Sequence, residues 1–318
     1  MSGLSLSLKT LAVVVLAALI QLTGLTGAAR ALDAAPLVNT GWLHDNLEDE
    51  DLLVLDIRSP LAKSGKDDYL KGHIPGAVWS EYPGYWRTSR GDVTGVLPSI
   101  EKLEASLSEL GVHEDRTVIL VPAGTSDLDF GAAARIYWTF KYLGHDKVTI
   151  LNGGHAAWLA AGHAVETGEI VPEGDMFVAE PRPELLVSTD EVASLVGGNA
   201  LLLDSRPQTQ FNGLEKHDDA TRFGHLPGAT HFDQAQFYDG AANTLKPLDQ
   251  LKTLAVEVAA SSSDPVIAYC NTGHWAATNW FVLTELLGYE NVAVYDDSMV
   301  GWSRQSDLPM ISAKTATN

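Results

Sequence analysis

The sequence predicts an α/β protein made of two tandem copies of one unit, each a parallel sheet flanked by helices. Short apolar runs, typical of buried parallel strands, alternate with segments whose apolar residues recur at helical spacing. The same order of segments occurs twice along the 318 residues, a length that suits two domains. We therefore expect one copy over residues 36–165, a linker over 166–184 and a second copy over 185–308.

Each copy opens with a helix and a buried strand. The helices are predicted to begin after Asn39 and after Ser188, because both residue types are good N-caps. Ser188 also forms a predicted capping box with Glu191. Apolar strands are predicted next over residues 53–58 and 201–206, and both end in an Asp-x-Arg sequence.

The middle of each copy is a turn followed by an amphipathic helix. Residues 73–77 and 225–229 both contain His, an aliphatic residue, Pro, Gly and Ala in that order, and the Pro-Gly pair predicts a turn. Apolar residues at helical spacing then predict helices over 100–110 and 248–258.

The last part of each copy is a strand, a helix and a second strand. The strands are predicted over 117–121 and 266–269, the helices over 132–143 and 276–287, and the closing strands over 148–151 and 292–295. Proline, glycine and acidic residues between the copies predict an exposed linker, and the polar residues after Pro309 predict a frayed tail.

The N-terminus is typical of a secretory signal peptide. Lys9 precedes the unbroken apolar run 11–20, and Ala29-Arg30-Ala31 fits a small-x-small cleavage site. The apolar run is short for a membrane span, although an uncleaved anchor remains the alternative. We expect residues 1–31 to be a signal peptide and the protein to be periplasmic or secreted.

Charge and cysteine content exclude several classes of function. The chain has 41 acidic against 21 basic residues and a net charge of −20, which argues against nucleic acid and, beyond export, against membrane surfaces as partners. One cysteine permits no internal disulfide and no zinc site built on cysteine pairs. We expect no metal and no other cofactor.

The single cysteine, Cys270, stands where a predicted strand ends and a helix soon follows. Backbone N–H groups ahead of a helix have no intrahelical partner and can converge on an anion such as a thiolate. Aligning the strands of the two copies places Pro122 at the position of Cys270. Proline has neither a thiol nor an N–H group, so we expect the first copy to be catalytically inactive.

These motifs resemble the tandem-domain rhodanese family, the thiosulfate and 3-mercaptopyruvate sulfurtransferases. Residues 69–77 fit the family's aromatic-x-x-x-His-aliphatic-Pro-Gly-Ala signature, and residues 270–276 fit its Cys-x-x-Gly-x-x-Ala active loop. The resemblance covers roughly residues 37–305. It implies two rhodanese-like domains, of which only the second carries an active cysteine.

The resemblance also implies a sulfurtransferase with ping-pong chemistry. The Cys270 thiolate would take a sulfane sulfur from a donor, hold it as a persulfide and pass it to a thiol or another nucleophile. The persulfide would be bound by the loop residues that follow, which are Asn271, Thr272, Gly273, His274, Trp275 and Ala276. The expected partners are a small donor, a thiol acceptor and, as a further candidate, a partner protein.

Three more side chains are candidate substrate contacts. Gln210 stands where the family has a substrate-binding arginine, and Arg222 is a candidate for the missing positive charge. Arg206 is also a candidate, but pairing with Asp204 beneath the loop is the interpretation we prefer.

The loop departs from both branches of the family. Thiosulfate enzymes have basic residues directly after the cysteine, where this chain has Asn271 and Thr272; mercaptopyruvate enzymes have Val-Thr where this chain has His274 and Trp275. For His274 two roles are open: a proton donor or anion partner near neutral pH, and a solvated loop residue. Trp275 either lines the pocket or packs against the rest of the protein. We expect the dianion thiosulfate to be a poor donor that improves at low pH if His274 protonates.

Three other functions are weighed against this one. A non-enzymatic periplasmic sulfur carrier would use the same persulfide and pass it to a protein partner. A phosphatase of the cysteine type needs an arginine where this chain has Ala276. A thiol–disulfide oxidoreductase needs a second cysteine, which the sequence lacks.

Overall fold

The computed structural model describes residues 32, 34–258 and 265–312. The predicted signal peptide and its uncleaved alternative, residues 1–31, lie outside the described residues, as does the end of the predicted tail. Leu32–Asn318 form one compact unit that contains both predicted copies, and the predicted boundaries of the copies stay a prediction. Within the described part of the chain, no helix is long and apolar enough to cross a membrane.

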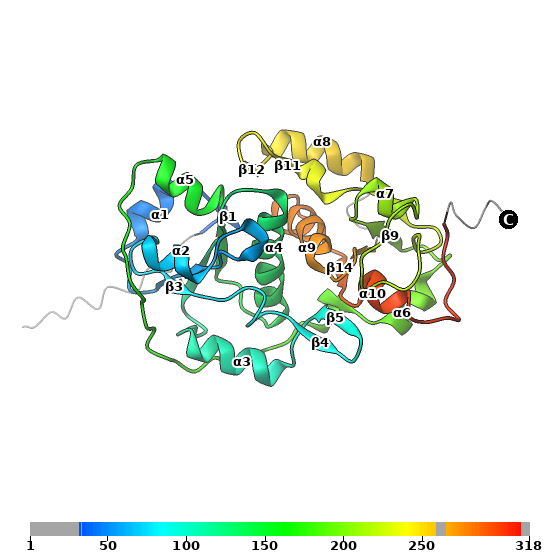
Figure 1. Cartoon of the computed structure of the whole chain (residues 1–318), viewed down its shortest axis with the longest axis horizontal. Coiled ribbons are helices and arrows are strands. Elements are labelled where there is room, and N and C mark those ends of the chain that lie inside the picture. The colour runs from blue at the N-terminus through cyan, green and yellow to red at the C-terminus, as the bar shows by residue number, and fades with distance from the viewer. Residues whose placement is uncertain (1–31, 33, 259–264, 313–318) are drawn as a thin grey trace, which may run out of the picture. The chain divides into compact units, whose positions relative to one another are not determined.

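Two five-stranded parallel sheets confirm the predicted fold class (Figure 1). In spatial order, the first consists of β1 (Leu37–Val38), β7 (Val148–Leu151), β6 (Thr117–Val121), β2 (Leu52–Asp56) and β3 (Val78–Trp79). The second consists of β10 (Thr230–His231), β9 (Leu201–Asp204), β13 (Val266–Tyr269), β14 (Val292–Tyr295) and β8 (Leu186–Val187). All residues of β6 and β13, the middle strands, are buried, as expected for a parallel sheet covered on both faces.

The helices occur in the same order in both copies. The first copy has α1 (Thr40–Asn46), α2 (Lys66–Lys71), α3 (Ile100–Glu109), α4 (Asp127–Tyr142) and α5 (Gly154–Ala160). The second has α6 (Thr189–Leu195), α7 (Gln208–Phe211), α8 (Leu248–Val258), α9 (His274–Phe281) and α10 (Ser298–Trp302). Short 3-10 turns occur at η1 (Pro60–Ala62), η2 (Pro183–Leu185) and η3 (Gln234–Phe237), and a π-helical turn at η4 (Val282–Leu286).

The predicted helix starts of both copies are confirmed. The Asn39 side chain accepts a hydrogen bond from the N–H of Trp42 at 2.9 Å. Ser188 and Glu191 form the complete capping box. Each cap satisfies N–H groups that have no partner inside the helix, which explains why the helices begin where the sequence indicates.

Two helix predictions need correction. α4 begins at Asp127 rather than at 132, because the Ser126 side chain accepts the N–H of Asp129 and caps the helix earlier. The second-copy helix predicted over 276–287 begins at His274, and its α-helical part ends at Phe281. The chain then continues as the π-helical turn η4.

α4 and α9 pack against each other and join the two copies (Figure 1). The Phe281 ring contacts Tyr137 edge-on at a centroid distance of 4.8 Å and Phe130 at 5.9 Å. Buried aromatic side chains contribute a large apolar area to such an interface. Since α4 follows the first-copy loop and α9 the cysteine loop, this packing brings both loops to one interface.

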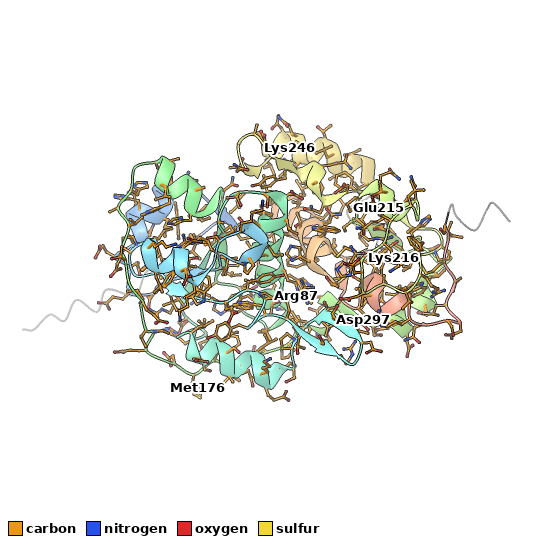
Figure 2. All side chains as sticks on the ribbon, in the orientation of Figure 1. Arg87, Met176, Glu215, Lys216, Lys246 and Asp297 are labelled. Atoms are coloured by element: carbon orange, nitrogen blue, oxygen red, sulfur yellow. The ribbon has the colours of Figure 1, made fainter. Side chains whose placement is uncertain are left out.

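The linker is more closely bound to the first copy than its composition predicts. Met176 is exposed, as expected, and lies at the edge of the molecule (Figure 2). Phe177 is buried, however, and its N–H donates to the Ser108 hydroxyl at 3.0 Å. The N–H of Ala179 donates to the Glu104 carboxylate at 2.9 Å, so the linker runs along α3.

Two antiparallel hairpins were not predicted. They are β4 (Thr88–Arg90) with β5 (Val93–Val96), and β11 (Tyr238–Asp239) with β12 (Thr244–Leu245). Their strands are short and mixed in polarity, so no period-two pattern marks them. The β4–β5 hairpin belongs to the first copy but contacts the cysteine loop of the second.

Strand register confirms that Pro122 and Cys270 are equivalent. Asp56 pairs with Val121 in the first sheet, and Asp204 pairs with Tyr269 in the second. Pro122 and Cys270 are the next residues along the chain. The two positions therefore stand at the same end of the same strand.

The equivalence extends to the turn that supports each loop. The carbonyl of Pro122 accepts the N–H of His155 at 2.8 Å, and that of Cys270 accepts the N–H of Met299 at 3.1 Å. The residues before these donors are Gly154 and Ser298, with φ of +55° and +48°. Left-handed backbone suits glycine, so Ser298 carries strain that its first-copy counterpart does not.

We expect Ser298→Gly to be more stable than Ser298→Ala by about 1 kcal/mol in free energy of unfolding. Both substitutions remove the hydroxyl, and only alanine keeps the left-handed strain. Chemical denaturation of the two variants measures the difference. Gly154→Ala is the control and should destabilise strongly, because a Cβ there would lie 2.2 Å from the Pro122 carbonyl. Equal stability of the two Ser298 variants would show that this position is not strained.

Candidate functional site

Cys270, the only cysteine of the chain, follows β13, the middle strand of the second sheet. It is 1% exposed and belongs to the main apolar core. α9 begins after Gly273, whose φ is +74° and which provides no side-chain cap. The first N–H groups of α9 therefore have no intrahelical acceptor, and an anion beside Cys270 can use them.

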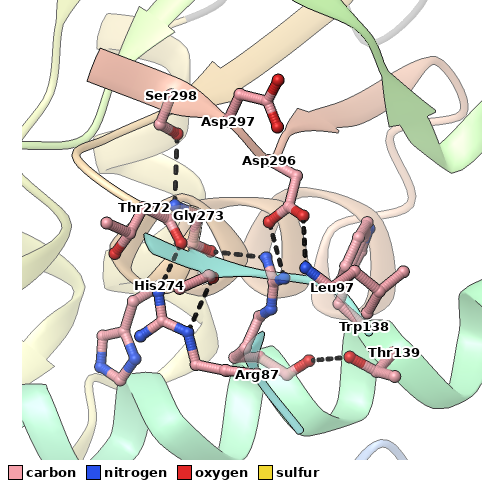
Figure 3. Close-up of polar contacts among 12 residues, drawn as sticks. Arg87, Leu97, Trp138, Thr139, Thr272, Gly273, His274, Asp296, Asp297 and Ser298 are labelled. Atoms are coloured by element: carbon pink, nitrogen blue, oxygen red, sulfur yellow. Dashed lines mark hydrogen bonds and ion pairs between the residues drawn. The ribbon is translucent and has the colours of Figure 1, made fainter. Parts of the chain in front are cut away.

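The Ser298 hydroxyl binds the cysteine loop from its own copy (Figure 3). It accepts the N–H of Cys270 at 3.1 Å and that of Gly273 at 3.2 Å, and it donates to the Tyr295 carbonyl at 2.7 Å. The N–H of Val300 donates to the Asn271 carbonyl at 3.0 Å. These contacts fix both ends of the loop, which gives a function to the strained backbone of Ser298.

His274 occupies a different environment from either of the two predicted. It is buried between the copies, with Nε2 2.9 Å from the Leu128 carbonyl and Nδ1 2.7 Å from the Tyr82 hydroxyl. Because a carbonyl only accepts, Nε2 donates to Leu128 and Nδ1 accepts from Tyr82. Burial, together with the nearby Arg87 charge, lowers the pKa of His274 to about 3.

The predictions of a proton-donating His274 near neutral pH and of a solvated His274 are therefore both wrong. The imidazole is neutral, and it bridges α9 to the first copy. Its two partners are distant in sequence, and no local pattern around His274 indicates them. The expected improvement of thiosulfate at low pH loses its physical basis.

Gln210 and Asn271, predicted separately, lie together. The Asn271 side-chain N–H donates to Gln210 Oε1 at 2.8 Å. Asn271 is buried, and its Oδ1 has no hydrogen-bond partner among the described residues. A neutral amide pair therefore stands beside Cys270 where the family's thiosulfate enzymes have basic residues.

Arg206 is buried and pairs with Asp204, as the preferred interpretation predicted. Its Nε and Nη2 donate to the two carboxylate oxygens at 2.8 and 2.6 Å, and Nη2 also donates to the Gly224 carbonyl at 2.9 Å. Arg58 and Asp56 form the equivalent buried pair in the first copy. Since the copy without a cysteine keeps the pair, its role is structural.

Arg222 is not available as a substrate contact. Its guanidinium donates to the carbonyls of Ser303, Leu308, Trp302 and Gln305 at 2.7 to 3.0 Å. A guanidinium has five N–H donors, and these four hydrogen bonds use four of them, all on carbonyls of the C-terminal segment. The predicted role in substrate binding is corrected to one in anchoring that segment.

The remaining loop residues differ in exposure. Ala276 is fully buried, and Thr272 is nearly so. Trp275 is partly buried and packs against the core, and its indole Nε1 has no hydrogen-bond partner in the described part of the chain. Trp275 therefore packs against the core and keeps a buried indole N–H without a hydrogen-bond partner among the described residues.

The equivalent loop of the first copy contains its own anion. The Asp129 carboxylate accepts the N–H of Gly124 at 2.6 Å, that of Ala123 at 3.2 Å and that of Thr125 at 3.4 Å. Burial raises the pKa of Asp129, and the backbone hydrogen bonds oppose that rise. That Asp129 accepts these N–H groups was not predicted, although an acidic residue in the first turn of α4 was the available signal.

The first-copy loop is also tightly closed. A Cβ on Gly124, whose φ is +76°, would lie 1.8 Å from the Gly153 carbonyl. No side chain fits at that position, and the loop has a proline where the second copy has its thiol. Among residues 32, 34–258 and 265–312, no group of three or more His, Cys, Asp or Glu side chains could hold a metal ion.

Similarity to known proteins agrees with this geometry. The Rhodanese-like domain family matches residues 39–161 and 188–305. Thiosulfate/3-mercaptopyruvate sulfurtransferase 2 of Arabidopsis thaliana is 29% identical over 306 residues, covering 88% of this chain and 87% of the relative. Sulfur carrier protein TtuD of Thermus thermophilus is 29% identical over 290 residues, covering 86% of this chain and 95% of the relative.

A solved structure extends the similarity to the whole fold. SseA from Escherichia coli, a 3-mercaptopyruvate sulfotransferase with the rhodanese fold, superimposes with a TM-score of 0.72 at 28% identity and covers 83% of this chain and 99% of SseA. Each of the two segments that match the family model contains the inner strands of one of the two five-stranded parallel sheets. The chain belongs to the rhodanese family and is a sulfurtransferase with two tandem rhodanese-like domains.

Proposed function

We propose that the protein transfers a sulfane sulfur from a donor to a thiol or another nucleophile through a persulfide on Cys270. The observation that carries this proposal is the difference between the two loops. Asp129 occupies the N–H groups of the first loop, whereas α9 of the second begins without a side-chain cap beside the only thiol. N–H groups at a helix start, which have no intrahelical acceptor, stabilise negative charge on a neighbouring sulfur.

The reaction has two balanced steps. The Cys270 thiolate attacks the outer sulfur of the donor; an S–S bond forms, and the donor's bond to that sulfur breaks with its electron pair on the leaving group. An acceptor nucleophile then attacks the outer sulfur of the persulfide, and the S–S bond breaks to regenerate the thiolate. Free N–H groups at the start of α9 would stabilise the anionic outer sulfur between the steps.

A non-enzymatic sulfur carrier is the alternative, and one comparison favours keeping it. The relative from Thermus thermophilus bears the name sulfur carrier protein. A carrier would form the same Cys270 persulfide and release the sulfur only to a partner protein. Multiple turnover with a small donor and a small thiol acceptor distinguishes the enzyme from the carrier.

We expect Cys270→Ser to fold normally and to lose all sulfur transfer, because it replaces the only thiol. Incubating the wild-type protein with a donor should add about 32 Da, the mass of one sulfur, and the variant should gain nothing. Intact-mass spectra and steady-state turnover provide the two measurements. Pro122→Cys combined with Cys270→Ser is the matched control: it places a thiol in the first loop only and should stay inactive, since Asp129 fills that loop. Turnover above a few per cent of wild type by Cys270→Ser would contradict the proposal.

We expect an organic persulfide to be a better donor than thiosulfate at every pH from 5 to 8. Thiosulfate is a dianion, and the Gln210–Asn271 pair offers no positive charge. Each missing charge-assisted hydrogen bond costs about 1.5–3 kcal/mol, so losing two weakens binding by a hundredfold or more. Because the pKa of His274 is about 3, acidification in this range adds no charge at that residue.

Steady-state kinetics with thiosulfate, 3-mercaptopyruvate and glutathione persulfide test this order. Asn271→Lys is the informative variant, because it adds a cation beside Cys270 and should improve kcat/KM for thiosulfate selectively. A wild-type kcat/KM for thiosulfate equal to or above the other two would show that charge at these positions does not select the donor.

We also propose export, with cleavage after Ala31. The support is the order of Lys9, the apolar run 11–20 and the Ala-Arg-Ala sequence. N-terminal sequencing of the protein recovered from the periplasm or medium should begin at Leu32. Recovery of the intact N-terminus in the membrane fraction would instead support an uncleaved anchor.

A further inference from the structure

Two arginines of the first copy donate to the cysteine loop of the second. Arg87 Nη2 donates to the Thr272 carbonyl at 2.7 Å, and Arg135 Nη1 donates to the Gly273 carbonyl at 3.4 Å (Figure 3). Arg87 lies just before β4, and Arg135 lies on α4. The copy without a cysteine therefore contacts two consecutive peptide groups of the loop.

Peptide planarity makes these contacts relevant to the N–H groups. In a trans peptide, the C=O and the N–H of the next residue point in opposite directions. Arg135 on the Gly273 carbonyl thus sets the direction of the His274 N–H, which is the first N–H of α9. In the same way, Arg87 on the Thr272 carbonyl sets the direction of the Gly273 N–H, which donates to Ser298.

Arg87 is held in place by the hairpin. Its Nε donates to the Gly95 carbonyl at 2.9 Å. Gly95 has a φ of +74°, and a Cβ there would lie 2.2 Å from Arg87 Nη2 and 3.1 Å from the Thr272 side chain. Glycine at this position is what allows the guanidinium to pass between the hairpin and the loop.

Arg135 is held still more rigidly, because it is fully buried. Its Nη2 is 2.6 Å from Asp296 Oδ1, and Asp296 Oδ2 accepts the N–H of Leu97 at 2.7 Å. The guanidinium also lies over the Trp138 ring, 4.6 Å from its centroid. Removing Arg135 would leave Asp296 buried without its cation, so Arg87, which is only partly buried, is the residue to test.

We propose that Arg87 is a positioning residue: by donating to the Thr272 carbonyl, it directs the Gly273 N–H to Ser298 and so fixes the loop that surrounds Cys270 and leads into α9, whose first N–H groups would stabilise the thiolate. A charged donor on a carbonyl forms a stronger hydrogen bond than a neutral one and polarises the peptide group it contacts. The proposal rests on the proposed function only in taking Cys270 as the reactive group. Its immediate consequence concerns the ionisation of the thiol and not the transfer of sulfur.

The test is the pH dependence of iodoacetamide alkylation of the full chain. Because Cys270 is the only cysteine, the rate reports on that thiol alone. We expect Arg87→Ala to move the midpoint of the rate profile upward by about one pH unit, which slows alkylation about tenfold at pH values well below the midpoint. Arg87→Lys keeps one cationic donor and should recover part of the rate. Recovery should be incomplete, because lysine lacks the planar fork that donates to both the Gly95 and the Thr272 carbonyls.

Arg90→Ala is the matched control on the same hairpin. Arg90 carries the same charge, but it is ion-paired with Asp297 and its side chain is 67% exposed. Figure 2 labels Arg87 and Asp297 near the middle of the molecule, where the hairpin meets the second copy. Removing an exposed cation should leave the alkylation profile unchanged, because solvent screens its charge.

Each outcome bears on the proposal. An unchanged midpoint in Arg87→Ala, or an equal shift in Arg90→Ala, would overturn it, the second by showing an effect of overall charge. If Arg87→Ala unfolds, Arg87→Gln, which keeps a shorter, neutral donor, takes its place and should shift the midpoint in the same direction by at most one unit. A wild-type protein that gains no sulfur from donors would refute the proposed function while leaving the alkylation shift as a separate result.

Discussion

The difference between the two copies depends on which group accepts the backbone N–H groups of the loop between the middle strand of each sheet, β6 or β13, and the helix that follows it. Parallel sheets place a loop and a helix N-terminus at this point in both copies, and unpaired N–H groups in a buried loop cost free energy. In the first copy Asp129 provides an internal carboxylate. In the second, Ser298 accepts two of these groups, and the start of α9 remains open beside Cys270.

The two copies have therefore diverged at one end of one strand while keeping the same sheet. Each retains the buried Asp-Arg pair and the left-handed turn beneath the loop. What differs is the group at the strand end: a proline followed by a loop whose N–H groups bind Asp129 in one copy, and a thiol followed by a helix start without a side-chain cap in the other. A duplicated fold tolerates this change because the strand and its neighbours carry the stability, and the loop carries the chemistry.

The cysteine-free copy nevertheless contributes to the site. Tyr82 and Leu128 bind His274 and fix its tautomer, and Arg87 and Arg135 donate to the carbonyls of the two residues before it. A neutral imidazole and two guanidinium groups therefore line the interface beside the loop. The packing of α4 on α9 keeps these groups in register with the second copy, since each helix begins at its own loop.

Local sequence was sufficient for the three inner strands of each parallel sheet and for the place of the single thiol at a strand end. The strands of four or five residues in the two parallel sheets are mostly apolar, and the caps at Asn39 and Ser188 are local hydrogen bonds, so neither needs knowledge of distant residues. Cys270 and the Pro122 substitution follow from aligning one copy with the other. The β4–β5 hairpin has no such pattern, because its residues are mixed in polarity and bind a loop far along the chain.

The sequence by itself determined a duplicated parallel α/β fold, one thiol at a strand end and a neutral pair of residues in place of basic ones. Only the tertiary structure decided what surrounds that thiol. It buried His274, joined Gln210 to Asn271, directed Arg222 away from the site and brought Arg87 to Thr272. Periodicity and capping act over a few residues, whereas these contacts join residues separated by 61 to 185 positions, and their geometry follows from how the two copies pack.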